Sequence, residues 1–279
     1  MIQVKDVSFK YEEGTGATLH DITLSIPDGQ FVGITGAAGS GKSTLTYILN
    51  GIVPHCYPGD FYGSVEIDGH DTVETSLTDI SRLVGSVCQD IDSQMVSSVV
   101  EDEVLFGLEN FGVPKDEVEA RLETALSDMG IAELRHRNIA SLSGGQKQKV
   151  AVASILALAP KVLVLDEPTA ELDPASSRAV FELLAACARE KKITVVVVEQ
   201  KIALLGEYCD RLLVVEDGKI ALDGACREVF DSSERLFNAG INCPRSTSLV
   251  NRLRESGLYC GPACRNVAEA TVVLEEVLA

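Results

Sequence analysis

The chain has 279 residues, of which 46% are hydrophobic and 24% charged, ordinary values for a globular protein with a substantial core. The formal net charge of −18 argues against nucleic acid as a partner, because its phosphates would be repelled, and against simple adhesion to anionic lipid. The first ten residues lack the apolar core of a secretory signal peptide, so the eight scattered cysteines are expected to be reduced thiols.

The first third of the chain is predicted to be rich in strands. Residues 2–11 and 19–27 alternate apolar and polar side chains, which is typical of strands buried on one face. The stretch QFVGITG predicts a buried strand that runs into a glycine-rich turn, and residues 42–52 predict the helix that follows. GSVEIDG then predicts a short strand between turn glycines, and RLVGSVCQ predicts another buried strand.

The pattern becomes helical from residue 99 to about residue 159. The helices expected in this region cover residues 99–110, 116–129 and 144–158. Strands return in KVLVLDEP, ITVVVVEQ and RLLVVEDGKIALDG, with a helix predicted over 175–190. Strands that alternate with helices indicate an α/β fold on a parallel sheet, here interrupted by a mostly helical insertion. After Gly224, short helices around Pro244 and over 266–278 indicate a small C-terminal appendage.

The stretch GAAGSGKST fits the phosphate-loop pattern G-x-x-x-x-G-K-[ST]. Its glycines allow backbone N–H groups to curl around an anion, and the following helix adds its dipole. Lys42 is expected to reach the β- and γ-phosphates of a nucleotide, and the Ser43 hydroxyl to bind Mg²⁺. A glycine-rich turn with a surface lysine is the alternative, but this motif follows a buried strand and opens a helix, as a phosphate site requires. The residues predicted to bind nucleotide here are Gly36, Gly39, Ser40, Gly41, Lys42, Ser43 and Thr44.

A second part of the site is predicted in VLVLDEPT, residues 162–169. Asp166 ends a buried apolar strand and is placed to hold Mg²⁺, directly or through water. Glu167 follows it, and a carboxylate at that position can act as general base on an attacking water. Acidic residues often cap strand ends, so this motif takes its functional meaning from its pairing with the phosphate loop.

The stretch SLSGGQKQKVAVASILALAP predicts a further helix start that can bind an anion. Ser143 can cap this helix, and Gly144 and Gly145 leave its first turn bare for the close approach of a phosphate. A chain that already has Lys42 does not need a second such site for its own nucleotide. The arrangement makes sense if this surface closes over the nucleotide bound by another copy.

With LSGGQ between the phosphate loop and VLVLDEP, the sequence resembles the nucleotide-binding subunit of ATP-binding-cassette (ABC) proteins over roughly residues 2–224. The resemblance implies a P-loop NTPase cassette over residues 1–224, with a RecA-like core, an antiparallel β subdomain and a helical subdomain at about 91–159. Residues 225–279 would form a helical appendage, a candidate for dimerisation. It further implies a head-to-tail dimer with two ATP molecules, each between the phosphate loop of one subunit and the LSGGQ of the other. The LSGGQ residues in contact with ATP would be Ser143, Gly144, Gly145 and Gln146.

The resemblance also implies roles for three isolated residues. Tyr11, at the end of the first strand, matches the aromatic residue that stacks on adenine, and an edge-strand aromatic is the alternative. Gln89 matches the glutamine that touches Mg²⁺ and the attacking water and senses the membrane partner. Asp173 in AELDP matches the aspartate that crosses between subunits.

Gln200 stands where the family usually has a histidine that contacts the γ-phosphate. None of the four histidines lies near enough in the sequence to replace it. A glutamine amide can donate a hydrogen bond to phosphate, but it carries no charge and cannot relay a proton. We therefore expect a site that binds ATP well and hydrolyses it slowly, or one that depends on a more complete partner site. A tolerated replacement with little effect is the alternative.

The segment QDIDSQMVSSVVEDEVLFGLEN resembles the ATPase subunits of energy-coupling-factor importers, which take up vitamins or nickel and cobalt. It departs from them at Ile91, where a proline is common. The stretches GIVPHCYPGDFYGSVEIDG and VVVVEQK resemble the first half of tandem two-ATPase chains in that group. The resemblance implies that helix 99–110 and the loop at 89–97 form a groove for a coupling helix of a transmembrane subunit. Its apolar lining would come from Val96, Val99, Val104 and Phe106, and a purely structural use in the core is the alternative for half of these side chains.

The sequence therefore predicts an ATPase that binds ATP and Mg²⁺ and powers an importer of the energy-coupling-factor type, with a vitamin or a transition-metal ion as cargo. The expected partners are a second ABC ATPase subunit, a transmembrane coupling subunit and a substrate-binding membrane component, at the cytoplasmic face of the cell membrane. A heterodimer of ATPases is favoured over a homodimer. The alternatives are a soluble ABC ATPase without a transporter, and a nucleotide-gated structural subunit with little turnover because Gln200 replaces the histidine.

Overall fold

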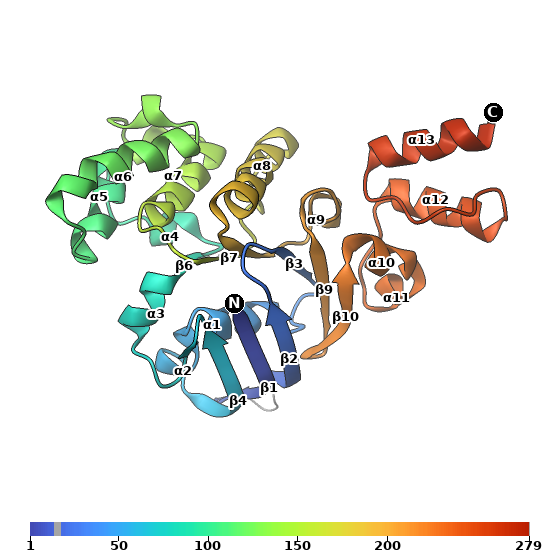
Figure 1. Cartoon of the computed structure of the whole chain (residues 1–279), viewed down its shortest axis with the longest axis horizontal. Coiled ribbons are helices and arrows are strands. Elements are labelled where there is room, and N and C mark those ends of the chain that lie inside the picture. The colour runs from blue at the N-terminus through green and yellow to red at the C-terminus, as the bar shows by residue number, and fades with distance from the viewer. Residues whose placement is uncertain (14–17, 279) are drawn as a thin grey trace.

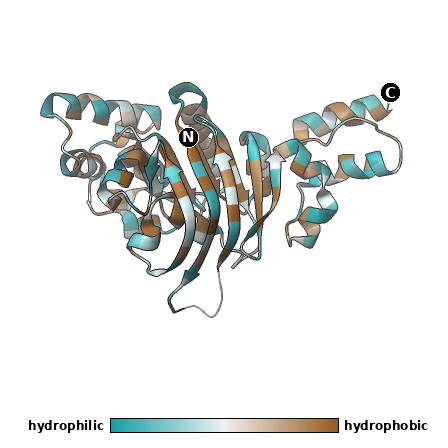
Figure 2. Cartoon of the chain, turned by 60° about the horizontal axis from the view of Figure 1, so that its bottom comes forward, coloured by the Kyte–Doolittle hydropathy of each residue, from teal (hydrophilic) through white to brown (hydrophobic). Residues whose placement is uncertain are grey.

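Two β-sheets organise the chain, of which the computed structural model describes residues 1–13 and 18–278 (Figure 1). The smaller sheet is antiparallel, in the order β2-β1-β4-β5. Its strands are β1 (Ile2–Tyr11), β2 (Leu19–Ile26), β4 (Gly59–Ile67) and β5 (His70–Asp71). In β2, Ile22, Leu24 and Ile26 are buried between exposed neighbours, because successive side chains of a strand point to opposite faces. Figure 2 shows the alternation of hydrophobic and hydrophilic bands along these curved strands.

The larger sheet has the order β10-β9-β3-β8-β7-β6, in which β10 is antiparallel to β9 and the other neighbours are parallel. Its strands are β3 (Phe31–Thr35), β6 (Val84–Val87), β7 (Val162–Asp166), β8 (Thr194–Val198), β9 (Arg211–Glu216) and β10 (Lys219–Ala225). Every residue of β3 and β8 is buried, as expected for strands covered on both faces. Because parallel strands end at the same edge, the segments that follow β3, β6, β7 and β8 meet there.

The helices form three groups along the chain (Figure 1). The core carries α1 (Lys42–Leu49), α2 (Ile52–His55), α3 (Leu77–Leu83), α8 (Pro174–Lys191) and α9 (Ile202–Tyr208). The helical subdomain consists of α4 (Ile91–Gln94), α5 (Val100–Asn110), α6 (Lys115–Asp128), the short 3₁₀ helices η1 (Ala132–Leu134) and η2 (Ile139–Ser141), and α7 (Gly144–Leu156). The appendage contains α10 (Cys226–Asp231), α11 (Ser233–Asn238), α12 (Arg245–Glu255) and α13 (Val267–Leu278). Among the described residues, none of these helices is both long and apolar enough to cross a bilayer.

Two hydrophobic clusters lie on opposite faces of the larger sheet. Val195 and Val197 of β8 belong to the cluster shared with the helical subdomain and α8, whereas Val196 and Val198 belong to the cluster shared with α1 and the antiparallel sheet. A third, small cluster lies inside the appendage and is formed by Val250, Cys264, Ala270 and Val273. The predicted α/β architecture, with antiparallel, helical and C-terminal parts, is confirmed.

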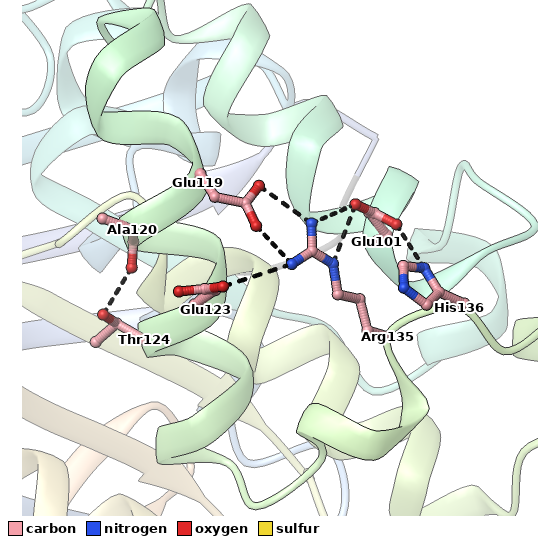
Figure 3. Close-up of polar contacts among 7 residues, drawn as sticks. All are labelled: Glu101, Glu119, Ala120, Glu123, Thr124, Arg135 and His136. Carbon is pink, nitrogen blue, oxygen red and sulfur yellow. Dashed lines mark hydrogen bonds and ion pairs between the residues drawn. The ribbon is translucent and has the colours of Figure 1, made fainter.

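An ion-pair cluster joins the elements of the helical subdomain (Figure 3). Arg135, directly after η1, donates from Nη2 to Glu101 Oε1 of α5 at 2.5 Å and from Nη1 to Glu119 Oε1 of α6 at 2.6 Å. His136 Nδ1 lies 2.8 Å from the other carboxylate oxygen of Glu101. One guanidinium therefore links α5, α6 and η1.

Several elements differ from those predicted. The helix expected over 42–52 ends at Leu49, because Gly51 adopts a φ of 76° that interrupts it before α2. The strand expected in GSVEIDG begins earlier, at Gly59, and bends at Gly63, where the register with β1 shifts. A Cβ on Gly63 would lie 2.4 Å from the carbonyl oxygen of Lys5, so this bend requires glycine. The short helices α3 and α4 were not predicted.

One of the four predicted groove residues, Val104, has the structural role in the core that was the alternative for half of them. Val96 and Phe106 are exposed, at 61% and 50%, but Val104 has no exposed surface and belongs to the core. Residues two apart on a helix point about 200° apart, so Val104 and Phe106 face nearly opposite directions. Only Phe106 of this pair is available to a partner.

Candidate nucleotide-binding site

The phosphate loop lies between β3 and α1 and is shaped by its glycines. A Cβ on Gly36 would lie 2.2 Å from the carbonyl oxygen of Val215, so only glycine lets the loop pass this close to β9. Gly41 has a φ of 104°, a conformation that favours glycine, and it leads directly into α1. In the described part of the chain no side chain caps the start of α1, which leaves its first N–H groups available to an anion.

Lys42 closes the loop on itself. Its Nζ donates to the carbonyl oxygens of Gly36 at 3.0 Å and Ala37 at 2.8 Å, and the residue is only 7% exposed. Burial lowers the pKa of the Lys42 ammonium, and the carboxylates of Glu167 and Asp166 oppose that shift. The ammonium is therefore held at the mouth of the loop by two neutral carbonyls, which an anionic phosphate can outcompete.

The two predicted carboxylates follow one another at the end of β7. Burial raises the pKa of Asp166, as does the charge of Glu167, while a hydrogen bond from Ser43 and the Lys42 ammonium lower it. A hydroxyl beside a carboxylate supplies the oxygen ligands that Mg²⁺ prefers. Glu167 has a left-handed φ of 48°, which costs on the order of 1 kcal/mol for a residue with a Cβ. Its N–H donates to the carbonyl of Val198 at 2.9 Å, and this bond to β8 holds the strained residue in place.

The three residues predicted to act in hydrolysis lie together. Gln89 donates from Nε2 to Glu167 Oε2 at 3.3 Å, and Gln200 donates from Nε2 to Glu167 Oε1 at 2.6 Å. They come from the segments after β6, β7 and β8, which are neighbours in the sheet. Each oxygen of the carboxylate thus has an amide donor and keeps a further lone pair that can accept a proton from water.

A cleft of about 870 Å³ opens beside these carboxylates. Ser43, Gln89 and Asp166 line one wall, and Gly144 and Lys147 of α7 line the other. The two walls belong to the core and to the helical subdomain. A movement of one against the other would therefore change the width of the cleft and the separation of its polar groups.

The glycines of LSGGQ stand at the start of α7, where the predicted cap is present. Ser143 Oγ accepts from the N–H of Gln146 at 3.3 Å, and Gln146 Oε1 accepts from the N–H of Ser143 at 3.0 Å. A Cβ on Gly145 would lie 3.0 Å from Ser176 Oγ, whereas one on Gly144 would touch only a leucine side chain at 3.4 Å. Gln146 therefore holds the helix start in shape, and the bare first turn is exposed to an incoming anion.

Asp173, predicted to cross between subunits, caps α8 of its own chain. Its Oδ1 accepts from the N–H groups of Ala175 at 2.9 Å and Ser176 at 3.1 Å, and its Oδ2 accepts from the Ser176 hydroxyl at 2.6 Å. The hydrogen bond from the Ser176 side chain lowers the pKa of this carboxyl. Asp173 is thus an exposed, oriented charge at the end of the loop that begins with Glu167.

Tyr11 belongs to an aromatic cluster beside the phosphate-loop helix. Its hydroxyl lies 3.2 Å from Thr44 Oγ1 of α1, and its ring packs edge-on against Tyr57 with centroids 6.2 Å apart. Tyr57 in turn stacks on Tyr47 of α1 at 5.6 Å. Sequence reasoning assigned no role to Tyr47, although it stands three residues after Thr44 and hence on the same face of the helix.

The fold and the site together define a P-loop nucleotide hydrolase with a separate glycine-led helix facing its cleft. Residues 19–170 match the family model described as ABC transporter. A protein of Pyrococcus horikoshii assigned as an ABC transporter ATP-binding protein is 42% identical, over 92% of this chain and 91% of its own length. The chain belongs to the ABC transporter family.

One further relative and two solved structures are also similar to the chain. An energy-coupling factor transporter ATP-binding protein of Caldanaerobacter subterraneus subsp. tengcongensis is 40% identical over 92% of both chains. The structure of CbiO1 from Clostridium perfringens, part of the ABC transporter complex CbiONQ, has a TM-score of 0.76 at 33% identity and covers 91% of this chain and 98% of its own. A dimeric ATP-binding cassette in a post-hydrolysis state with ADP and Pi has a TM-score of 0.70 at 26% identity, over 81% of this chain and 99% of its own. The protein is an ATP-binding ABC ATPase of a transporter.

Proposed function

We propose that this ATPase powers an importer of the energy-coupling-factor type, which takes up a vitamin or a transition-metal ion, and that it works at the cytoplasmic face of the membrane. Similarity to CbiO1 and to energy-coupling factor ATP-binding proteins supports the proposal. The observation that carries it is the position of Gln89. Its amide contacts Glu167, and it opens the segment that leads to the exposed Val96 and, on α5, Phe106. ATP chemistry is thus connected to an apolar surface on which a transmembrane coupling subunit can act.

In this proposal ATP binds with its phosphates along residues 36–44 and its adenine against Tyr11. Ser43, Asp166 and Gln89 would hold Mg²⁺, because hydroxyl, carboxylate and amide oxygens suit a hard cation. When bound, the ion supplies charge neutralisation at the β- and γ-phosphates.

Glu167 is the residue that takes the proton from the attacking water. Gln89 and Gln200 hold its two oxygens, so the carboxylate needs little reorganisation when water arrives. The proton moves to Glu167 as the water oxygen approaches the terminal phosphate.

A second ABC ATPase subunit completes each site. Residues 143–146 and Asp173 of that subunit would close over the ATP bound by this chain, in a head-to-tail dimer. A different chain is favoured over a second copy, because Gln200 leaves this site without the usual histidine. A substrate-binding membrane component would select the cargo.

A subunit with little turnover, which binds ATP chiefly to hold the dimer closed, is the second candidate. The short hydrogen bond from Gln200 to Glu167 favours it, since an amide already occupies one lone pair of the base. The intact Glu167 argues for catalysis. Turnover of Gln200→His and Gln200→Ala distinguishes a subunit that hydrolyses ATP from one that chiefly holds the dimer closed.

The transporter proposal is tested by capture of partners from detergent-solubilised membranes with the tagged full chain. We expect integral membrane proteins to be retained by wild type and lost with Phe106→Asp. Phe237→Asp, which charges a phenylalanine 70% exposed on α11 in the appendage, is the matched control and should retain them. If wild type retains no membrane protein, or both variants lose all of them equally, the proposal fails.

A further inference from the structure

The residues on both sides of Gln200 bind the same loop that carries Glu167. Glu199 directly follows β8, and it is only 2% exposed. Its carboxylate accepts a hydrogen bond from the hydroxyl of Thr169, a residue that is itself fully buried. It also accepts the N–H groups of Gln200 at 2.8 Å and Lys201 at 3.0 Å. A buried carboxylate is costly unless it is hydrogen-bonded, so these three donors make Glu199 tolerable in the core.

Lys201 holds the loop from its other side. Its Nζ donates to the carbonyl oxygens of Thr169 at 2.6 Å and Leu172 at 3.1 Å, and to Ser177 Oγ at 3.0 Å. Thr169 is thereby bound through its hydroxyl by Glu199 and through its carbonyl by Lys201. Bonds to ionised groups are the stronger class of hydrogen bond, and here they converge on one residue of the loop.

The three consecutive residues 199–201 therefore all form hydrogen bonds to the loop that follows β7. Gln200 binds the Glu167 carboxylate, Glu199 binds Thr169, and Lys201 binds Thr169 and Leu172, one residue before Asp173. The loop is also attached at its start, where the N–H of Glu167 bonds to the last residue of β8. A shift of the loop would therefore carry Gln200 and Glu167 with it as one unit.

We infer that Glu199, Lys201 and Thr169 are positioning residues for ATP hydrolysis, which fix the Glu167 carboxylate between Gln89 and Gln200. In the described part of the chain, their side-chain hydrogen bonds go to one another, to this loop, to the backbone after β8 and to α8, away from the phosphate loop where the nucleotide is proposed to bind. Their loss should therefore act on the chemical step and spare binding. The inference rests on the proposed role of Glu167 as general base, which Glu167→Gln tests separately. It does not depend on the kind of transporter.

The test is a pair of substitutions at Thr169 in the full chain. Thr169→Val keeps the shape of the side chain and removes the hydroxyl, whereas Thr169→Ser keeps the hydroxyl. We expect kcat of Thr169→Val to fall by about 10- to 100-fold, because a small misplacement of a catalytic group is enough for such a loss. KM and the Kd for ATP should stay within about twofold, and Thr169→Ser should restore most of kcat.

Thr194→Val is the matched control, because it removes a buried threonine hydroxyl at the start of β8, the end of that strand opposite to Glu199. Thr194 is 1% exposed, and its Oγ1 accepts the N–H of Gly29 at 3.1 Å. Both valine variants should lower Tm by similar amounts, but only Thr169→Val should lower kcat.

Three outcomes would overturn the inference. One is an unchanged kcat in Thr169→Val; another is an equal loss of kcat in Thr194→Val; the third is a loss of ATP affinity in parallel with kcat. If Thr169→Val fails to fold, Lys201→Met replaces it in the same measurements, since the methionine keeps most of the aliphatic stem and removes three donations to the loop. An unchanged kcat in Lys201→Met would then refute the positioning role.

Discussion

The conformation of Glu167 is restricted by its backbone dihedral and by several hydrogen bonds. Its φ lies in the left-handed region, and its N–H donates a hydrogen bond to β8. Its two carboxylate oxygens each accept a hydrogen bond from a side-chain amide. Such strain persists only where the surroundings determine the conformation, and it is found preferentially at functional sites. These contacts hold the Glu167 carboxylate in one position, as its proposed role of general base requires.

Replacement of Glu167 by glutamine should abolish turnover while leaving ATP binding intact. Loss of a positioned general base typically costs about 10²- to 10⁴-fold in rate. The measurement is steady-state phosphate release together with equilibrium binding of ATP. Glu190→Gln, an equal change of charge at an exposed position of α8, should behave as wild type. If Glu167→Gln retained turnover, another group would have to be the base.

Gln200 gives the second prediction at this site. Gln200→His should raise turnover, because an imidazole can carry charge and exchange a proton where an amide cannot. Gln200→Ala should lower it, because the 2.6 Å bond to the carboxylate is lost. The measurement is the steady-state ATPase rate of wild type and both variants, alone and with their partners. Equal rates in all three proteins would mean that Gln200 is a tolerated replacement.

The residues proposed to bind phosphate and to act on it could be recognised in the sequence because their spacing is local. Lys42 lies six residues after Gly36, and Asp166 and Glu167 are adjacent, so each motif is visible in one short stretch. Glu199 could not be assigned a role from sequence, since its partner Thr169 is 30 residues away and meets it only in the folded sheet. Contacts across neighbouring strand ends have no sequence signature of their own.

The helical subdomain depends on the ion-pair cluster around Arg135 (Figure 3). Hydrogen bonds from Arg135 lower the pKa of Glu101 and of Glu119 below the usual 4.5. A depressed carboxyl pKa stabilises the folded state above the unfolded value, and this contribution is lost as the pH falls through the folded pKa. The cluster is therefore expected to hold α5, and with it Phe106, only when both carboxyls are ionised.

Arg135→Gln should accordingly lower Tm at pH 7, and the difference from wild type should narrow as the pH falls below 4.5. Thermal unfolding followed by circular dichroism over this pH range provides the measurement. Arg121→Gln removes an exposed pair with Glu117 within α6 alone and should have the smaller effect. A difference that stayed constant down to pH 3 would show that Arg135 acts through packing and not through charge.

Elements with long, regular patterns were predictable, and those defined by single glycines were not. The buried strands β7 and β8 can be recognised in the sequence from their runs of branched apolar residues. The break between α1 and α2 depends on the positive φ of Gly51, and the length of β4 depends on the bulge at Gly63. A glycine in a sequence allows such a conformation without requiring it.

The appendage is joined to the cassette by apolar packing as well as by directed contacts, because Val229, Phe230 and Leu236 of α10 and α11 belong to the large apolar cluster of the cassette. Its last part, with α12 and α13, has a small apolar cluster of its own, and Arg265 between these helices donates to the carbonyl oxygens of Gly206 at 2.8 Å and Glu207 at 3.0 Å in α9. Phe230 packs so closely on Gly206 that a Cβ there would lie 2.5 Å from its ring. Composition alone could not reveal this attachment, because the helix pattern after Gly224 says nothing about what the helices pack against.

Arg265→Met should loosen the appendage and leave the nucleotide site unchanged. Two hydrogen bonds from a charged donor are lost, each typically contributing about 1.5–3 kcal/mol. Hydrogen–deuterium exchange should rise in α12 and α13 and remain unchanged in α1. Arg252→Met, at an exposed position of α12, is the control. Faster exchange in α1 would show that α12 and α13 are coupled to the nucleotide site more tightly than their contacts indicate.

The aromatic cluster of Tyr11, Tyr47 and Tyr57 has a spectroscopic consequence. The chain contains no tryptophan and only six tyrosines, so half of its tyrosines surround the expected adenine pocket. A purine stacked on these rings would change their absorption and emission through direct contact, and the native protein would then report its own occupancy without a label. Any tryptophan introduced elsewhere would be a single, unambiguous emitter against that background.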